Sequence, residues 1–177
     1  MFDDWSKGAS IAEVSIRLVV AILVGGLIGF DRERQDKPAG FRTHMLVSLG
    51  AATFTLLGFE VGAHLSPRTG EGFDPTRVLQ GVVGGIGFLG AGVIIQRGTQ
   101  VSGVTTAASV WLSGALGAAA GVGAYVLAVI STALALAILT ILGRLDSKIS
   151  GQKKPDEAEP AASRADETKR PAAPAPQ

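Results

Sequence analysis

The sequence predicts an all-α integral membrane protein: a compact bundle of about five transmembrane helices followed by a disordered C-terminal tail. Hydrophobic residues make up 47% of the chain and charged residues only 18%. No Asp, Glu, Lys or Arg occurs from Val104 to Leu142, a run about twice as long as one membrane crossing. Several other long apolar runs accompany it. A hairpin buried in a soluble core is the alternative, but helices of soluble proteins need a polar face.

The first three helices are predicted from separate apolar runs, each near the ~20 residues that cross a bilayer. Glu13 and Arg17 interrupt the first run with i, i+4 spacing, so they can pair on one face near its start. Asp74 and Pro75 precede the third run, and these residue types favour the N-cap and the first turn of a helix. The predicted helices lie near residues 11–30, 45–61 and 76–95.

Two more helices are predicted within the uncharged run. Gly121-Val122-Gly123 near its middle favours a tight turn, which places the helices near residues 105–120 and 124–142. The first of them is short, so a tilted, kinked or re-entrant segment is the alternative. We therefore assign residues 1–145 to a transmembrane domain. Residues 146–177 hold almost no large apolar side chains, so we expect them to form a disordered cytoplasmic tail.

The orientation is predicted from Lys and Arg, which are enriched in cytoplasmic loops. The loop after the first helix and the flank after the last helix are the most basic segments, and five crossings place both on the same side. The N-terminus is therefore expected outside and the C-terminus in the cytoplasm. The basic residues are Arg32, Arg34, Lys37 and Arg42 in the loop, and Arg144, Lys148, Lys153 and Lys154 in the flank.

Glycines within the predicted helices recur four residues apart, a pattern that lets helix backbones approach closely in lipid. They predict close packing inside the chain, with a homodimer face as the alternative that the sequence leaves open. The run from Gly85 to Gly90 also matches the dinucleotide fingerprint G-x-G-x-x-G, but it lies within an apolar span and lacks the acidic residue about 20 positions on. The three pairs are Gly25 and Gly29, Gly81 and Gly85, and Gly117 and Gly121.

The composition excludes several function classes. The chain has no cysteine, so disulfides, thiol catalysis and cysteine-ligated zinc are excluded. The formal net charge of +1 gives no indication of a nucleic-acid partner. With two histidines and no serine in a nucleophile elbow, we expect neither an enzyme nor a bound cofactor. A divalent-cation site is left open, and its candidate ligands are Glu60, His64, Glu71 and Asp74.

Polar residues gather in three further places. Asp31, Glu33 and Arg42 are either a solvated flank of the first helix or a polar network at the mouth of the bundle. Arg97 at the end of the third helix can extend to the lipid headgroups. Hydroxyl groups on one face of the fourth helix are expected to bond to neighbouring helices or to carbonyls of their own helix, with a polar path as the alternative. These residues are Ser102, Thr105 or Thr106, Ser109 and Ser113.

Four blocks of sequence carry a resemblance to a known family. In order they are Gly40 to Ala51 (GFRTHMLVSLGA), Asp74 to Arg77 (DPTR), Gly85 to Ile94 (GIGFLGAGVI) and Gly103 to Trp111 (GVTTAASVW). Together they resemble the signature stretches of the MgtC/SapB family, and the resemblance covers about residues 18–142. It implies a small, multi-pass protein of the bacterial inner membrane. Many longer relatives carry an ACT-like cytoplasmic domain, for which the tail here is too short and too polar.

The resemblance also implies a function. Family members are linked to growth in low magnesium, and they are proposed to act on other membrane complexes, including inhibition of the F-type ATP synthase. We therefore expect a non-enzymatic regulator linked to magnesium homeostasis that has a membrane-protein partner. The alternative is a transporter or channel for Mg²⁺ or another small solute. The positions that match the family's motifs, and that are expected to form a functional polar cluster, are Asp31, Arg32, Glu33, Arg42, Thr43, His44, Asp74, Arg97, Thr105, Thr106 and Trp111.

Overall fold

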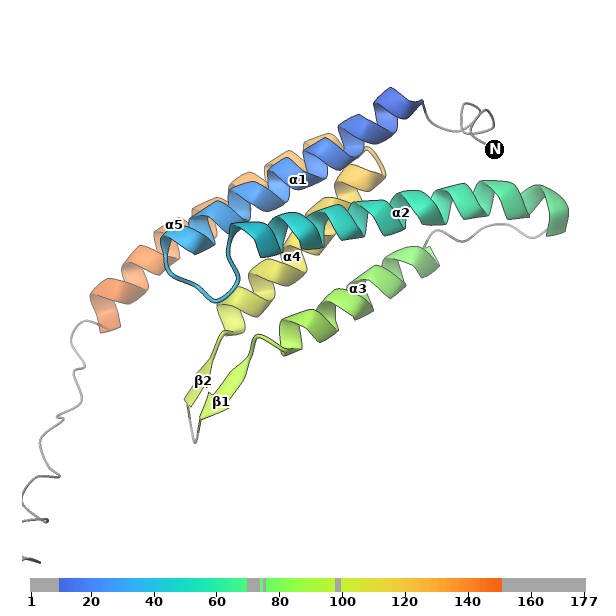
Figure 1. The fold of residues 1–177 in the computed structure, drawn as a ribbon. Coiled ribbons are helices and arrows are strands. Elements are labelled where there is room, and N and C mark those ends of the chain that lie inside the picture. The colour runs from blue at the N-terminus through green and yellow to red at the C-terminus, as the bar shows by residue number, and fades with distance from the viewer. Residues whose placement is uncertain (1–9, 70–73, 75, 98–99, 151–177) are drawn as a thin grey trace, which may run out of the picture. The chain divides into compact units, whose positions relative to one another are not determined.

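The computed structural model describes residues 10–69, 74, 76–97 and 100–150. Within those ranges it contains five α-helices and one two-stranded antiparallel sheet (Figure 1), so the predicted helical fold is confirmed. The chain divides into residues 1–143, which hold the helical bundle, and residues 144–177, whose described part is the end of the last helix. The elements are α1 (Ile11–Arg34), α2 (Phe41–Thr69), α3 (Thr76–Ala91), β1 (Ile95–Arg97), β2 (Gln100–Ser102), α4 (Val104–Gly121) and α5 (Tyr125–Ser150).

Three of the described helices are long and apolar enough to cross a membrane: α1, the Phe41–Gly62 part of α2, and α4. A shorter apolar stretch, Tyr125–Ile141, lies in α5. Helix α3 has 16 residues and is about 24 Å long, somewhat less than the ~30 Å hydrocarbon core. Large apolar side chains face outward, and Leu23, Leu27 and Phe30 on α1 are each more than half exposed. Because a soluble protein buries such a stripe, the chain is a membrane protein.

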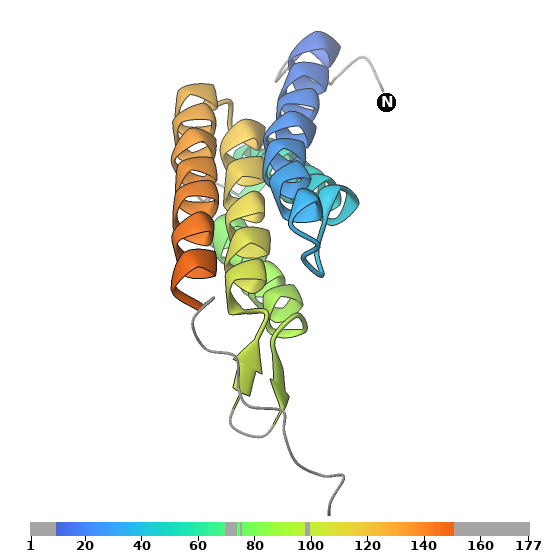
Figure 2. The ribbon, with the colours of Figure 1, turned by 90° about the vertical axis from the view of Figure 1, so that its left-hand side faces the viewer.

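The core between α1, α2 and α4 is built from small residues. Ala21, Ala52 and Ala120, one from each helix, are buried together. Small side chains let the three backbones approach closely, which maximises van der Waals contact between helices in lipid. A second apolar cluster joins α5, which runs beside α4, to α1 and α4 (Figure 2). Its buried members are Val24, Ile28, Leu116, Ala128 and Ala135.

Two glycine pairs, one on α1 and one on α4, lie where these helices approach α2 most closely. A Cβ atom at Gly25 or Gly29 would lie 2.6 Å or 2.7 Å from the backbone of α2. A Cβ atom at Gly117 would overlap the backbone carbonyl of Ser48, and one at Gly121 would lie 2.9 Å from another α2 carbonyl oxygen. Side chains at these four positions would therefore separate the helices.

The glycine pair on α3 has different surroundings. Gly81 and Gly85 both line the gap between α2 and α3. Within the part of the chain that the structure describes, a Cβ atom at either position would meet no heavy atom within 4 Å. The same spacing of glycines therefore accompanies close packing in α1 and α4 but open space on α3.

Helix α3 ends earlier than the sequence predicts. It stops at Ala91 instead of near residue 95, and Ile95–Arg97 form β1, which pairs with β2 so that Ile95 faces Ser102. Glycines at 90 and 92 weaken the helix, and the β-branched residues 93–95 favour an extended backbone. Because a short apolar run suits both a helix and a strand, hydrophobicity alone did not separate them.

The bounds of three other helices also differ from the prediction. Helix α1 continues to Arg34 instead of ending near residue 30. Helix α2 begins at Phe41 instead of near residue 45 and continues to Thr69. Helix α5 continues to Ser150, so residues 146–150, which were assigned to the disordered tail, are helical. The rest of the predicted tail, residues 151–177, lies outside the described residues.

Candidate functional site

A buried histidine lies where α1, α2 and α4 meet. His44, in the first turn of α2, is fully buried. Its Nδ1 lies 2.8 Å from the Gly40 carbonyl oxygen, and its Nε2 lies 3.1 Å from the Ser109 hydroxyl of α4. Because a carbonyl oxygen only accepts, Nδ1 carries a proton. A neutral ring is then satisfied when the Ser109 hydroxyl donates to Nε2. The alternative acceptor of that hydroxyl is the Thr106 carbonyl oxygen at 2.8 Å.

A buried guanidinium lies close to this histidine. Arg32, in the last turn of α1, is 2% exposed and acts electrostatically on His44. Its Nη2 donates to Gln35 Oε1 at 3.2 Å, and Gln35 in turn donates to Asp31 Oδ2 at 2.8 Å. Among the described residues, the Nε of Arg32 has no hydrogen-bond partner. We call Arg32, His44, Thr106 and Ser109 the buried polar cluster, because all four are buried and His44 links Arg32 to Ser109, whose hydroxyl lies 2.8 Å from the Thr106 carbonyl oxygen.

Glu33 holds the loop between α1 and α2. Its Oε2 accepts a hydrogen bond of 2.7 Å from the Phe41 amide, the first residue of α2. A carboxylate at this point satisfies a free amide and interacts favourably with the positive end of the helix dipole. Gly40 permits the approach, because a Cβ atom there would lie 2.8 Å from the same carboxylate oxygen. Glu33 therefore fixes the start of α2, the turn that carries His44.

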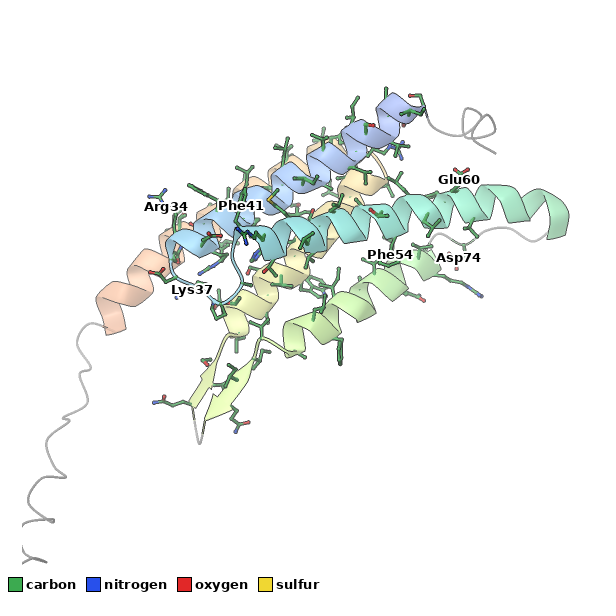
Figure 3. The ribbon with its side chains drawn as sticks, viewed as in Figure 1. Arg34, Lys37, Phe41, Phe54, Glu60 and Asp74 are labelled. Carbon is green, nitrogen blue, oxygen red and sulfur yellow. The ribbon has the colours of Figure 1, made fainter. Side chains whose placement is uncertain are left out.

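Three other predicted residues are exposed, and a fourth lies on β1. Arg42 and Thr43 are exposed next to His44, Thr105 is exposed in the first turn of α4, and Arg97 is the last residue of β1. All four belong to segments at the end of the bundle where α2 begins, which we call the Phe41 end (Figures 1 and 3). The side chains of Arg42, Thr43 and Thr105 do not enter the buried polar cluster, and they are accessible to a partner.

The two remaining predicted residues are remote from the cluster. Trp111 is 46% exposed and lines a small cavity of about 290 Å³ between α3, α4 and α5. Asp74 lies at the opposite end of the bundle (Figure 3), before α3. Its Oδ1 accepts hydrogen bonds from the Thr76 hydroxyl at 2.6 Å and from the Thr76 amide at 2.9 Å. Both bonds lower the pKa of Asp74 from its ordinary value, and the bond from the Thr76 hydroxyl has the larger effect. Asp74 is thus the cap of α3.

Metal ligation finds no support in the described residues, where no three His, Cys, Asp or Glu side chains gather closely enough to hold an ion. Two of the four candidate ligands, the His64 side chain and Glu71, lie outside the described part. Glu60 and Asp74, the other two, are described (Figure 3). The divalent-cation site therefore stays a hypothesis.

The predicted pairing of Glu13 with Arg17 is confirmed, and the structure adds a contact that the sequence does not reveal. Arg17 forms an ion pair with Glu13 on α1. Its Nη1 also donates to the Gly121 carbonyl oxygen at 2.9 Å, across 104 residues of sequence. A cation at the C-terminus of α4 complements the helix dipole. Ser48 of α2 makes a second side-chain bond to the main chain of another helix, because its hydroxyl donates to the Ala21 carbonyl oxygen of α1 at 2.7 Å.

Comparison with known proteins identifies the family. The chain matches the model described as MgtC family over residues 18–148. It is 36% identical over 138 residues to the putative magnesium transporter YhiD of Escherichia coli K12, and 41% identical over 140 residues to SrpB of Synechococcus elongatus. It is also 41% identical over 132 residues to MgtC of Brucella abortus. No solved structure matches.

These alignments cover most of this chain but not all of each relative. They take in 78%, 75% and 75% of the chain for YhiD, SrpB and MgtC respectively. They span 64% of YhiD, 76% of SrpB and 52% of MgtC. The matched region contains α2, α3, α4 and the buried polar cluster. The chain belongs to the MgtC family.

Proposed function

We propose that this chain is a non-enzymatic regulator of magnesium homeostasis in the bacterial inner membrane and that it acts by contact with another membrane complex. The proposed orientation places the N-terminus outside and the Phe41 end in the cytoplasm, because Arg34, Lys37, Arg42 and Arg97 lie at that end. The family resemblance makes the F-type ATP synthase a candidate partner. A second copy of the chain is a further candidate.

The observation that carries this proposal is the closed packing of the three-helix core. The backbones of α1 and α4 touch α2 so closely that a methyl group does not fit at Gly25 or Gly117. The buried hydroxyls there donate to main-chain carbonyls: Ser113 donates to Ser109 O at 3.0 Å and Thr55 to Ala51 O at 2.7 Å. Such a core supports a scaffold that presents surfaces, and it offers little to a hydrated ion, which needs a water-filled or oxygen-lined path.

The experiment is affinity capture of a tagged chain from membranes, followed by identification of the complexes that are enriched. The Arg42→Gln/Thr43→Ala variant changes two exposed side chains next to the cluster. Gln80→Ala is the control, because Gln80 is also exposed but lies near the start of α3, at the other end of the bundle. We expect one complex to be enriched with the native chain and the control and lost with the double variant. Equal capture by all three chains, or no enriched complex, would contradict the proposal.

A second candidate is a magnesium transporter. The relative YhiD carries that description, and the buried hydroxyls of α4 are the feature of this chain that favours it. Reconstitution in liposomes decides between the candidates through the rate of Mg²⁺ entry into vesicles that hold a fluorescent indicator. The regulator proposal predicts the rate of empty vesicles. A faster rate that falls with Ser113→Ala would favour the transporter.

Normal growth of a deletion strain at limiting Mg²⁺ would remove the link to magnesium from either proposal.

A further inference from the structure

An apolar groove runs between α2 and α3 on the outside of the bundle. It has a volume of about 870 Å³. Its floor is formed by Ala51, Val82 and Ile86, which pack together as a buried cluster. Phe54 and Leu57 of α2 line it and are more than half exposed. We call this feature the α2–α3 groove, and it is large enough to hold a ligand of lipid size.

Glycines keep the groove open. Gly50 on α2 and Gly81 and Gly85 on α3 all line it. Within the described part of the chain, a Cβ atom at any of the three would meet no heavy atom within 4 Å. Larger side chains at these positions would fill the groove, whereas side chains at the core glycines would separate the helices.

The groove is longer than the hydrocarbon of one leaflet but shorter than the whole hydrocarbon core of a bilayer. Its lining extends along α3 from Arg77 to Leu89, a rise of about 18 Å, and along α2 from Leu46 to Val61, a rise of about 22 Å. Half of the hydrocarbon core is about 15 Å thick, whereas a second membrane-crossing helix would need a surface of about 30 Å. An acyl chain that enters from the Asp74 end therefore fits the groove better than a complete helix does.

Charged side chains of both signs lie at the Asp74 end of the groove. Arg77 lines the groove, and its side chain is 85% exposed. Its Nε lies 4.0 Å from Asp74 Oδ2, at the outer limit of an ion pair. The two bonds from Thr76 go to the other carboxylate oxygen, Oδ1, and leave Oδ2 facing Arg77. The pair offers a cation for a phosphate and an anion for an ammonium group.

We propose that the α2–α3 groove binds one phospholipid with a zwitterionic aminophospholipid headgroup. An acyl chain lies along Gly81 and Gly85, the phosphate pairs with Arg77, and the primary ammonium pairs with Asp74. A bidentate contact between a guanidinium and a phosphate is among the stronger charge-assisted interactions. The inference is independent of the proposed function, because a regulator and a transporter could both hold such a lipid.

The experiment measures lipid retention by native mass spectrometry of the full chain, purified in detergent and titrated with phosphatidylethanolamine, phosphatidylglycerol or phosphatidylcholine. Gly85→Leu fills the groove. Gly84→Leu is the matched control, because Gly84 is equally open but does not line the groove. We expect one phosphatidylethanolamine to be retained at least 10-fold more tightly than either other lipid. Gly85→Leu should abolish this preference, and Gly84→Leu should keep it.

Headgroup variants test the charges separately. Arg77→Gln should weaken retention of phosphatidylethanolamine by about 5-fold or more, and Asp74→Asn should remove the preference over phosphatidylglycerol. Equal retention of the three lipids by the native chain would overturn the proposal. Retention that Gly85→Leu and Gly84→Leu change equally would also overturn it. If Gly85→Leu instead converts a dimer to a monomer with lipid retention intact, the groove belongs to a second copy of the chain and the lipid proposal is wrong.

Discussion

The three-helix core and the α2–α3 groove both contain two glycines four residues apart. In the core these glycines allow close contact between helices, whereas in the groove they leave open space. At Gly117 and Gly121 the backbone of α2 occupies the space that side chains would take. At Gly81 and Gly85 that space is open within the described part of the chain. The difference teaches that small-residue spacing permits close approach but does not determine whether a helix of the same chain makes it.

The largest expected effect comes from replacing glycine by alanine, which should change the free energy of unfolding in opposite directions in the two regions. Gly117→Ala should lower the free energy of unfolding by about 3 kcal/mol, because the new methyl group overlaps the Ser48 carbonyl. Gly85→Ala should raise it by about 0.5–1 kcal/mol, because alanine favours the helix and meets no neighbour. Unfolding of the detergent-solubilised protein measures both. If the two substitutions have similar effects, the contrast between core and groove is wrong.

A second substitution tests whether the buried polar cluster belongs to the core. His44→Ala should lower the free energy of unfolding by about 2 kcal/mol, because it leaves a cavity and removes the bond to Ser109. Thr43→Ala, at the exposed neighbouring position, should change it by less than about 0.5 kcal/mol. A double-mutant cycle with Ser109→Ala should give a coupling energy of about 1 kcal/mol. A coupling near zero would mean that the contact between α2 and α4 contributes nothing to stability.

A smaller effect is expected at the edge of the core, where Glu33 caps α2. Glu33→Ala should lower stability by about 1 kcal/mol and should speed amide hydrogen exchange in the first turn of α2. Glu33→Gln keeps an acceptor and should have roughly half that effect. Unchanged exchange at Phe41 in both variants would contradict the capping role.

The smallest expected effect is a pH dependence in the stability of the first turn of α3, at the Asp74 end of the groove. Bonds from Thr76 lower the pKa of Asp74, so the cap stabilises α3 at pH values above the ordinary carboxyl pKa. This stabilisation should fade as the pH falls through the lowered pKa of the folded state. Amide exchange in the first turn of α3, corrected for its intrinsic pH dependence, should then accelerate. Asp74→Asn should remove the pH dependence, and its persistence in that variant would assign it to another group.

Sequence reasoning predicted the membrane class, the number of helices and the Glu13–Arg17 pair, because hydrophobic length and i, i+4 spacing are local properties. It missed the hairpin of β1 and β2, since residues 93–95 are apolar and suit a helix and a strand equally.

The candidate site was predictable only in part. The motif residues Arg32, His44 and Thr106 are linked through His44 and Ser109, whereas Asp74 lies at the opposite end of the bundle and Trp111 lines the cavity between α3, α4 and α5. The role of Ser109 as the partner of His44 depends on which faces of α2 and α4 meet, and no local pattern specifies that. The same holds for the contact from Arg17 to Gly121, which joins residues 104 positions apart.

The most direct test of the closed core uses the absence of cysteine from the sequence. Ser113 is fully buried between the helices, and Ser113→Cys is nearly isosteric. We predict that a water-soluble thiol reagent applied to native membranes leaves Ser113→Cys unmodified while it labels Thr43→Cys at the exposed Phe41 end. Both variants should react after denaturation in detergent. Labelling of Ser113→Cys at a rate close to that of Thr43→Cys would reveal a water-filled path and would contradict the account.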